Sequence, residues 1–210
     1  MTTTLRQPEA PGPPVAAFDF DGTLTWRDSF IAFLIWRAGA AGFALGAASL
    51  APAALAYGLW RDRGRFKAAA ARRFMKGAPR AEIEDQAARF CEQRFDELMR
   101  PDAIDCWRDW RARGAMLIIV TASPELVVAP FARTLGADAL IGTRLEVDKD
   151  DRLTGRLLGA NCRAEEKLAR LRALLGENPR LTAAYGDTAG DREMLSIAQT
   201  AGYRVFRGRP

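Results

Sequence analysis

Short apolar runs alternate with longer amphipathic stretches along most of this chain of 210 residues. Val15–Phe18, Ala115–Val120 and Leu181–Tyr185 contain no charged residue, which is typical of strands buried in a parallel sheet. Ala139–Ile141 and Tyr203–Phe206 predict two further short strands. Because helical patterns separate these runs, the sequence predicts an α/β fold with a doubly wound parallel sheet.

The stretches between the runs carry apolar residues at helical spacing and begin or end at typical boundary residues. Asp28 and Ser29 can cap a first helix, Pro79 can open another, and Gly114 can end a third. Two short alternating segments around Asp148–Asp151 predict a β-hairpin. The predicted helices run from Asp28 through Trp36, from Arg61 to Lys76, from Pro79 to Leu98, from Asp102 to Arg113, from Ser123 to Gly136, from Ala164 to Leu175, and through Ile197.

The segment Ala38–Trp60 carries no charged residue. Roughly 20 apolar residues can cross a bilayer, but this segment is rich in Ala and Gly, and Pro52 interrupts it. A single crossing would also separate Asp19 from all later motifs, since no later apolar run is long enough to return. We therefore predict a helical hairpin, which either packs on the rest of the protein or dips into a membrane surface.

Charge is distributed unevenly, and the predicted helix Arg61–Lys76 contains seven Lys or Arg residues, Lys67 among them. Such a run is usually a solvated face. The whole chain has 31 Lys and Arg against 26 Asp and Glu, a net charge of +5, which suits anionic partners such as phosphate esters or acidic lipid headgroups. We expect no nucleic-acid partner, because the chain has no recognised binding motif and no basic stripe interleaved with aromatic residues.

The composition excludes several kinds of chemistry. The chain contains no histidine, so proton transfer must use Asp, Glu, Lys, Tyr or Cys. Its three cysteines are odd in number and lack metal-type spacing, which predicts reduced thiols in a cytoplasmic protein. Residues 1–14 are polar and Pro-rich without an apolar core, which predicts a disordered lead rather than a signal peptide.

Polar residues with catalytic chemistry follow three of the predicted strands. Ligands bind at the carboxyl ends of strands in an open α/β sheet, so these residues should share one site. Asp19 and Asp21 are two positions apart and can point the same way as the strand ends. Paired carboxylates need a nearby cation or a shared proton. The full set is Asp19, Asp21 and Gly22 after the first strand, Thr121 and Ser123 after the second, Asp187 and Asp191 after the third, and Lys167 near a helix start.

In this order the motifs resemble those of the haloacid dehalogenase-like phosphatase superfamily, over nearly the whole chain. The DxDGT motif is present at Asp19–Thr23, and the Thr at the end of an apolar strand is Thr121. The lysine that opens a helix is Lys167, and GDxxxD is met by Gly186–Asp191. A helical insertion between the first two motifs is similar to the cap of the phosphoserine-phosphatase-like subfamily, IB.

The resemblance implies a phosphomonoester hydrolase that uses Mg²⁺ and forms an aspartyl-phosphate. Asp19 would be the nucleophile, and Asp21 would act first as general acid and then as general base. Superfamily dehalogenases lack the second carboxylate, so Asp21 favours phosphate chemistry. Mg²⁺ would be held by Asp19, the Asp21 carbonyl and Asp187. The phosphoryl oxygens would be bound by Thr121, Lys167 and the N–H groups of Gly22 and Ala122. Supporting positions would be taken by Thr23, Ser123 and Asp191.

The same resemblance implies a Rossmann-like core at residues 15–29 and 106–210 with an all-helical cap at 30–105. The uncharged cap segment, the Arg-rich helix and the ending Tyr203–Arg207 look like phosphatidylglycerophosphatase C and its relatives. The favoured substrate is therefore a lipid-linked phosphate such as phosphatidylglycerophosphate, with peripheral contact at the inner membrane face. The runner-up is a small soluble ester such as phosphoserine. Family phosphoserine phosphatases carry a Glu for the substrate amine where this chain has the shorter Asp28.

Two alternatives belong to other classes. A two-component receiver domain also places acidic residues, a Thr or Ser and a Lys around an aspartyl-phosphate. Its acid pair precedes the acceptor on another strand, however, and it has no large helical insertion. A non-catalytic phosphate-binding or scaffold protein on the same fold stays open, although every expected catalytic side chain is present. The sequence predicts nothing about the oligomeric state.

Overall fold

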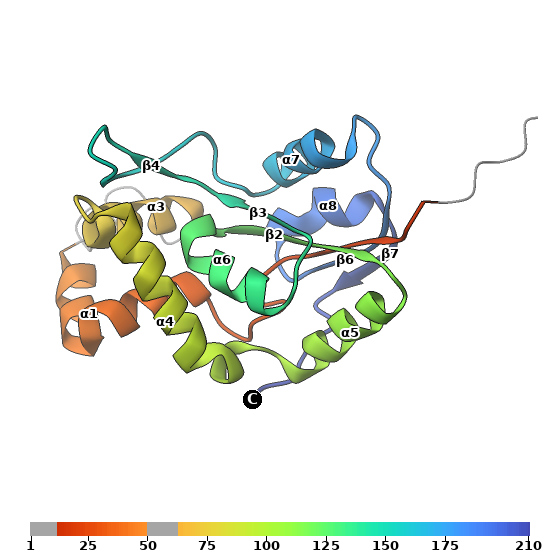
Figure 1. The fold of residues 1–210 in the computed structure, drawn as a ribbon, viewed down its shortest axis with the longest axis horizontal. Helices are drawn as coiled ribbons and strands as arrows, with labels where there is room; N and C mark the ends of the chain where they lie inside the picture. The colour runs from red at the N-terminus through yellow and green to blue at the C-terminus, as the bar shows by residue number, and fades with distance from the viewer. Residues whose placement is uncertain (1–11, 50–62) are drawn as a thin grey trace, which may run out of the picture.

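A five-stranded parallel sheet in the order β3-β2-β1-β6-β7 forms the centre of the protein (Figure 1). The structure is a computed structural model, and it describes residues 12–49 and 63–210. The chain order reverses on either side of β1, which creates a ligand-binding crevice at the carboxyl ends of the strands. The doubly wound α/β fold is thus confirmed. The strands are β1 (Val15–Phe18), β2 (Met116–Pro124), β3 (Ala139–Thr143), β6 (Leu181–Gly186) and β7 (Ala198–Tyr203).

Successive residues of β1 enter two different apolar cores, one on each face of the sheet. Ala16 and Phe18 belong to the core that contains residues of α5 (Pro101–Ala112) and α6 (Glu125–Thr134). Ala17 belongs to the core that contains residues of α7 (Glu165–Leu175) and α8 (Arg192–Ser196). Figure 1 shows these two helix pairs on opposite sides of the sheet. A strand covered on both faces explains why its sequence is continuously apolar.

The insertion between β1 and β2 is helical where the structure describes it. It contains α1 (Ser29–Ala48), α3 (Arg63–Met75) and α4 (Arg80–Leu98). The predicted cap of α1 is confirmed, because the Asp28 carboxylate accepts a hydrogen bond of 3.0 Å from the Ile31 N–H. The second part of the predicted helical hairpin, residues 50–60, lies outside the described residues. Most of the predicted disordered N-terminal segment, residues 1–14, lies outside them too. The division into a cap and a core domain at the stated boundaries stays a prediction.

Helix α1 is long and apolar enough, by length and composition, to cross a membrane, although only 22% of its most apolar window is buried. Gly39 breaks the regular helical backbone in its middle, with φ 71° and ψ 159°. Beyond this kink, Leu45 is 74% exposed. The helix therefore presents apolar surface that the described part of the protein does not cover.

The insertion is attached to the core through two adjacent chain segments. The Trp26 N–H donates to the Leu98 carbonyl at 3.0 Å, and the Arg100 N–H donates to the Leu24 carbonyl at 2.8 Å. Phe131 of α6 strengthens the attachment, because its ring lies 5.9 Å from the ring of Phe90 in α4. These contacts hold α4 against the core.

The predicted hairpin is confirmed as β4 (Leu145–Val147) and β5 (Leu153–Leu157). It binds to the link between α3 and α4, where the Leu153 carbonyl accepts from the Gly77 N–H at 2.7 Å and the Leu153 N–H donates to the Ala78 carbonyl at 2.9 Å.

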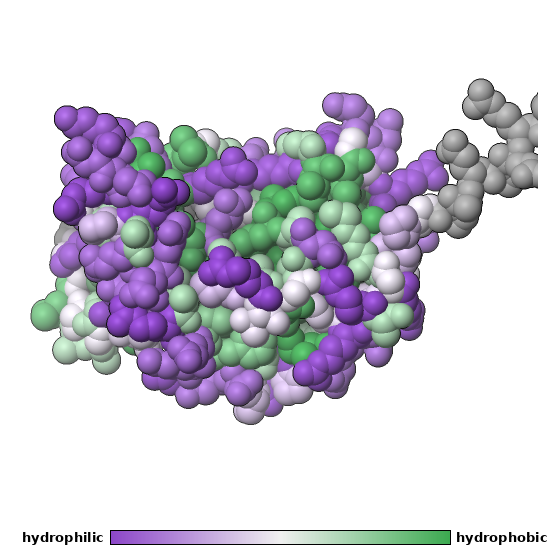
Figure 2. Space-filling model, in the orientation of Figure 1, coloured by the Kyte–Doolittle hydropathy of each residue, from purple (hydrophilic) through white to green (hydrophobic). Residues whose placement is uncertain are grey.

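Figure 2 shows mostly hydrophilic side chains over α4 and an apolar patch near β3. Strand β3 is one of the two edges of the sheet, which explains why Leu140 is only half-buried.

Two predicted boundaries are wrong. Strand β2 continues to Pro124, so Ser123 belongs to the strand rather than to the start of α6, while Thr121 lies in the strand as predicted. The last strand is β7, and the predicted strand Tyr203–Phe206 shares only its first residue with it. The sequence Ala-Gln-Thr-Ala-Gly has little intrinsic strand preference. Pairing of β7 with the buried strand β6 decides its position instead.

Candidate active site

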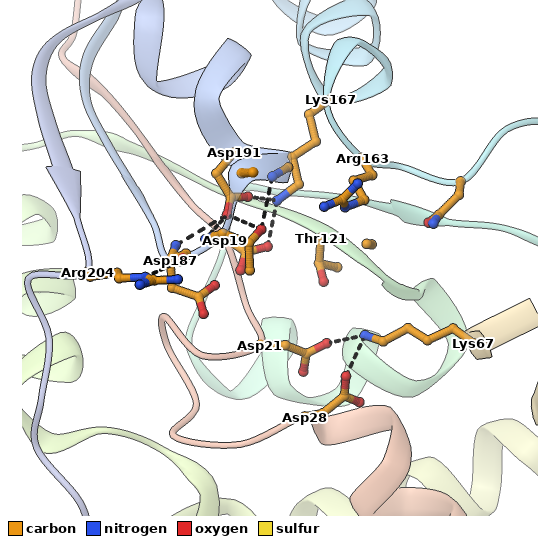
Figure 3. Close-up of a pocket in the computed structure, with 15 residues that line it drawn as sticks. Asp19, Asp21, Asp28, Lys67, Thr121, Arg163, Lys167, Asp187, Asp191 and Arg204 are labelled. Atoms are coloured by element: carbon orange, nitrogen blue, oxygen red, sulfur yellow. Dashed lines mark hydrogen bonds and ion pairs between the residues drawn. The ribbon is translucent and has the colours of Figure 1, made fainter. Parts of the chain in front are cut away.

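A cavity of about 300 Å³ opens at the carboxyl ends of β1, β2 and β6 (Figure 3). The side chains that line it come from all four predicted motifs, so the structure brings these motifs together. Gly22 and Thr23 adjoin this cavity without lining it. The predicted site residues in its lining are Asp19, Asp21, Asp28, Thr121, Ala122, Lys167, Asp187 and Asp191.

Lys167 is the buried cation of the site. Its Nζ lies 2.6 Å from Asp19 Oδ1, 2.6 Å from Asp191 Oδ1 and 2.6 Å from the Val120 carbonyl oxygen. A buried ammonium is stable only with such partners. Burial alone would lower the pKa of Lys167, but the carboxylates of Asp19 and Asp191 outweigh it and raise the pKa, so the side chain stays charged.

The backbone before α7 places Lys167 in this position. Ala164 has a positive φ of 54°, and its N–H donates to the Gly190 carbonyl at 2.9 Å. This bond joins the start of α7 to the loop after β6. Lys167 and Asp191 therefore approach each other although they come from different elements.

Burial dominates the ionisation of Asp19, which is only 6% exposed. Desolvation raises the pKa of Asp19 to about 7, although the Lys167 ammonium opposes the shift and Asp191 adds to it. A carboxylate in such a place gains from any further positive charge. The arrangement suits a site completed by a cation or by a ligand that brings one.

The loop after β6 is organised around the second carboxylate of the GDxxxD motif. Asp191 Oδ2 accepts from the Thr188 N–H at 2.9 Å, from the Thr188 hydroxyl at 2.9 Å and from the Asp187 N–H at 3.2 Å. Burial would raise the pKa of Asp191, but the charge of Lys167 outweighs it, and the pKa is lowered. Asp191 thus fixes the backbone that presents Asp187.

Gly22 allows the two ends of the site to meet. A Cβ at this position would lie 2.3 Å from Asp187 Oδ2, and the φ of +84° is in the region that favours glycine. The glycine of the DxDGT motif therefore makes room for the carboxylate of the GDxxxD motif.

The donor set fits a hard divalent cation. Asp19, Asp187 and Asp191 each offer an oxygen, and these oxygens lie within 4.8 Å of one another. Mg²⁺ prefers carboxylate oxygens of this kind. Because Lys167 and the Thr188 loop already engage both oxygens of Asp191, Asp19 and Asp187 are the better candidates for direct ligands, with Asp191 in support.

Two hydroxyl groups lie at or beside the cavity, that of Thr121 in its lining and that of Thr23 next to it. Thr121 Oγ1 accepts from the Ser123 N–H at 3.0 Å, which leaves the hydroxyl hydrogen of Thr121 for a ligand. Thr23 is buried, and its hydroxyl makes a long contact of 3.5 Å with Asp19 Oδ2. The Ala122 backbone lies at the same edge of the cavity.

Asp21 lies in a separate hydrogen-bonding network. Its Oδ1 accepts from the Ser29 N–H at 2.7 Å and from the Ser29 hydroxyl at 2.6 Å. Its Oδ2 accepts from the Ser123 hydroxyl and, at 2.8 Å, from Lys67 Nζ. Burial would raise the pKa of Asp21, but the Lys67 ammonium outweighs it, and the pKa is lowered.

The prediction of a solvated basic face is wrong for Lys67 and holds for other residues of α3. Lys67 Nζ also lies 2.9 Å from Asp28 Oδ2 and 2.8 Å from the Ser123 hydroxyl, and its side chain is only 13% exposed. Arg72 and Arg73 of the same helix are exposed. Composition could not separate Lys67 from them, because its partners are far away in the sequence.

Asp28 therefore lies in the cavity, as the sequence predicted, but it faces a cation of the protein itself. Its pKa is raised, mainly by burial and by the neighbouring Asp21, against the charge of Lys67.

Arg163 and Arg204 also line the cavity and were not among the predicted site residues. Arg204 Nε donates to the Asp187 carbonyl at 2.7 Å. From the sequence, Arg204 stood out only as part of the ending Tyr203–Arg207, and neither arginine had a predicted role in the site.

The chain belongs to the haloacid dehalogenase-like hydrolase family, which matches residues 16–196. Protein CicA of Caulobacter vibrioides is 59% identical over 198 residues, which cover 94% of this chain and 89% of that protein. Phosphoserine phosphatase SerB1 of Mycobacterium tuberculosis is 32% identical over 145 residues, which cover 66% of this chain and 44% of that protein.

Solved structures share the fold. A protein of unknown function from Bordetella pertussis Tohama I superimposes with a TM-score of 0.71 and 25% identity, over 90% of this chain and 88% of that one. A substrate-bound phosphoserine phosphatase gives a TM-score of 0.59 and 22% identity, over 92% and 87% of the two chains. The protein is therefore a hydrolase of this family with phosphatases among its relatives. The more specific resemblance to phosphatidylglycerophosphatase C stays a prediction.

Proposed function

We propose that the protein hydrolyses phosphomonoesters through an aspartyl-phosphate on Asp19. The observation that carries the proposal is the buried ammonium of Lys167, 2.6 Å from Asp19 and 2.6 Å from Asp191. Asp21 stands two residues further on, at the same cavity. A nucleophile, a second carboxylate for proton transfer and a fixed cation for phosphoryl charge are the parts that this reaction needs.

Each half-reaction uses these side chains in turn. A carboxylate oxygen of Asp19 attacks phosphorus in line, and the bond from phosphorus to the ester oxygen breaks. Because Lys67 keeps the pKa of Asp21 low, Asp21 first accepts the proton of the phosphate monoanion and then gives it to the leaving alkoxide. Asp21 then takes a proton from water, whose oxygen attacks phosphorus and releases phosphate and the Asp19 carboxylate. Lys167, the Thr121 hydroxyl and the N–H groups of Gly22 and Ala122 stabilise the phosphoryl oxygens.

Asp19 and Asp187, together with the Asp21 carbonyl, would hold Mg²⁺. The ion would neutralise charge on the phosphoryl group as it approaches two carboxylates. The chain itself keeps Asp187 in place through the hydrogen bonds that Asp191 accepts from the loop. Ser29 and Ser123 hold the Asp21 carboxyl group in a fixed orientation.

For the substrate, we propose a lipid-linked phosphate such as phosphatidylglycerophosphate, handled by a cytoplasmic protein at the inner membrane face. The exposed apolar surface of α1, including Leu45, supports contact with acyl chains or a membrane surface. Phosphoserine is the second candidate, and a separate observation supports it. Asp28 and Lys67 offer one charge of each sign in the cavity, as an amino acid would require.

Phosphate release with Mg²⁺ tests the proposal. Phosphatidylglycerophosphate in mixed micelles, phosphoserine and a simple aryl phosphate are compared at equal concentration. We expect hydrolysis of the aryl phosphate and a higher kcat/KM for the lipid than for phosphoserine. Preference for phosphoserine would contradict the lipid proposal alone. Hydrolysis of none of the three would contradict the phosphatase proposal and favour a non-catalytic phosphate-binding protein.

The apolar surface of α1 has a test of its own. Changing Leu45 to Glu puts a charge on the most exposed large apolar side chain described in α1 without disturbing the buried core. We expect lower activity on micellar lipid and unchanged activity on the aryl phosphate. Full activity of the variant on the lipid would contradict a role of this surface.

A further inference from the structure

A second cavity, of about 530 Å³, lies directly beside the active site. Its lining includes Gly22, Asp187 and four arginines: Arg100, Arg204, Arg207 and Arg209. Asp187 and Arg204 line both cavities, so the two spaces meet at these residues. Figure 3 shows Arg204 beside Asp187 at the edge of the site.

The four arginines concentrate positive charge around this cavity, where Asp187 lies in the same lining and the charge of Arg100 helps to lower the pKa of Asp102. Arg100 donates to carbonyl oxygens, at 3.3 Å to Thr25 and at 2.9 Å to Gly208. Arg204 donates to the Asp187 carbonyl at 2.7 Å. These contacts orient the guanidinium groups and leave other N–H groups for a ligand.

The chain segment that supplies three of these arginines is held in a defined conformation. Asp102 Oδ2 accepts from the Arg207 N–H at 2.7 Å and from the Gly208 N–H at 2.9 Å. The Phe206 ring lies 5.2 Å from the ring of Tyr185. The guanidinium group of Arg209 lies 5.5 Å from the Trp26 ring. The backbone segment that carries these three arginines is therefore held in place by the rest of the protein.

Several guanidinium groups around one space favour an anion with many acceptor oxygens. Arginine binds phosphate through two parallel hydrogen bonds, and such charge-assisted bonds are stronger than neutral ones. A ligand that spans both cavities would place one phosphate near Asp19 and a second anionic group among the arginines. A small amino acid ester has no such second phosphate to offer.

We infer that this arginine cavity binds a second phosphate group of the substrate, so that the preferred substrates carry a phosphomonoester and a further phosphate. The inference rests on the proposed phosphatase activity and specifies its substrate class. The second group can be the phosphodiester of a phospholipid headgroup or the other end of a soluble bisphosphate. Both present the same chemistry to the guanidinium groups.

A matched pair of variants tests the inference. Arg207→Gln with Arg209→Gln removes two charges from the cavity wall and touches no residue of the proposed catalytic machinery. Arg113→Gln with Arg133→Gln removes two exposed charges at the opposite ends of the strands and serves as the control. Each is assayed on propane-1,3-diyl bisphosphate against propyl phosphate, and on phosphatidylglycerophosphate against phosphatidic acid in mixed micelles.

We expect the cavity variant to raise KM at least about tenfold for one or both substrates with a second phosphate. KM for their single-phosphate partners should change less than twofold, as should all values for the control variant. If KM rises selectively for the bisphosphate within the soluble pair, the second group is that of a soluble bisphosphate. If KM rises selectively for phosphatidylglycerophosphate within the lipid pair, the second group is a headgroup phosphodiester. Equal losses within both pairs, or no loss in either, would overturn the inference.

Binding to Asp19→Asn separates this inference from the proposed function. Calorimetry with the bisphosphate and with propyl phosphate needs no turnover. We expect tighter binding of the bisphosphate, and loss of that difference when Arg207 and Arg209 are also changed. If the wild type hydrolyses no ester but this difference is found, the proposed function fails and the anion site stands. If both ligands bind equally, the anion site fails.

Discussion

Lys67 Nζ lies 2.8 Å from Asp21 Oδ2, although the two residues are 46 positions apart. Lys67 belongs to α3 of the inserted helical unit, and Asp21 follows the central strand of the sheet. The proposed acid–base residue thus has its charge partner on the insertion and not on the core. Any movement of α3 would change the charge next to Asp21, which links the position of the insertion to the chemistry.

Changing Lys67 to Met should lower kcat/KM at least about tenfold and lower the free energy of unfolding by about 3 kcal/mol. Removal of one partner from a mostly buried pair leaves the carboxylate uncompensated, and Asp21 and Asp28 would then face each other without a cation. Urea unfolding and steady-state kinetics measure both effects. Lys76→Met, at an exposed position just after α3, is the control, and equal behaviour of the two variants would refute this role.

Lys167→Met should be more damaging. The variant leaves Asp19 and Asp191 buried without their shared cation, so we expect a loss of about 3–5 kcal/mol of unfolding free energy without Mg²⁺. Turnover should fall by about 10³-fold, because a fixed positive charge at the phosphoryl oxygens is lost. Thermal unfolding and phosphate release are the measurements. Lys149→Met in the exposed hairpin is the control, and a stable, active Lys167 variant would contradict the site.

Changing Gly22 to Ala has two effects that a comparison with Gly114→Ala can separate: the added methyl group meets the Asp187 carboxylate, and a non-glycine residue is strained at positive φ. A non-glycine residue at positive φ costs about 1–2 kcal/mol, and Gly114, with φ 72°, carries the same strain with nothing within 4 Å of an added Cβ. Both variants should therefore lose similar stability. Only Gly22→Ala should lose activity, at least about tenfold, because its methyl group displaces the Asp187 carboxylate. Loss of activity in Gly114→Ala as well would assign the effect to strain.

Asp102 should make the ending of the chain sensitive to acid. Burial would raise the pKa of Asp102, but the N–H groups of Arg207, Gly208 and Ala103 outweigh it, so the folded pKa lies below the usual 3.8. The stabilisation is therefore present above about pH 4 and is lost as the pH falls through the folded pKa. Protection of the Arg207 and Gly208 amides from hydrogen exchange should decline in that window in the wild type. In Asp102→Ala, which has no acceptor oxygen, it should be low at every pH, and full protection in this variant would contradict the anchoring role.

Much of the core could be predicted because its signals are local. The strand β1 is apolar on both faces, and the motifs that follow β1, β2 and β6 meet because parallel strands end at one edge of a sheet. The start of α1 at Asp28 was visible as a capping residue. Spacing and burial were sufficient for these elements.

Other features depend on contacts that no local pattern records. Lys67 has the same sequence surroundings as the exposed arginines of α3, and only the approach of α3 to the segment after β1 and to the end of β2 distinguishes it. Strand β7 has weak intrinsic preference and forms because β6 offers a free edge. Arg207 and Arg209 face the arginine cavity because Asp102, about 100 residues earlier in the chain, binds the backbone beside them.

Mg²⁺-dependent phosphate release from an aryl phosphate, compared between the wild type and Asp19→Asn, tests the central claim most directly. The two side chains have nearly the same shape, so the variant should fold as the wild type does, which circular dichroism and thermal unfolding can verify. We predict phosphate release by the wild type with Mg²⁺, its loss on chelation of the metal, and no release above background by Asp19→Asn. Release by a folded Asp19→Asn protein at the wild-type rate would contradict an aspartyl-phosphate on Asp19.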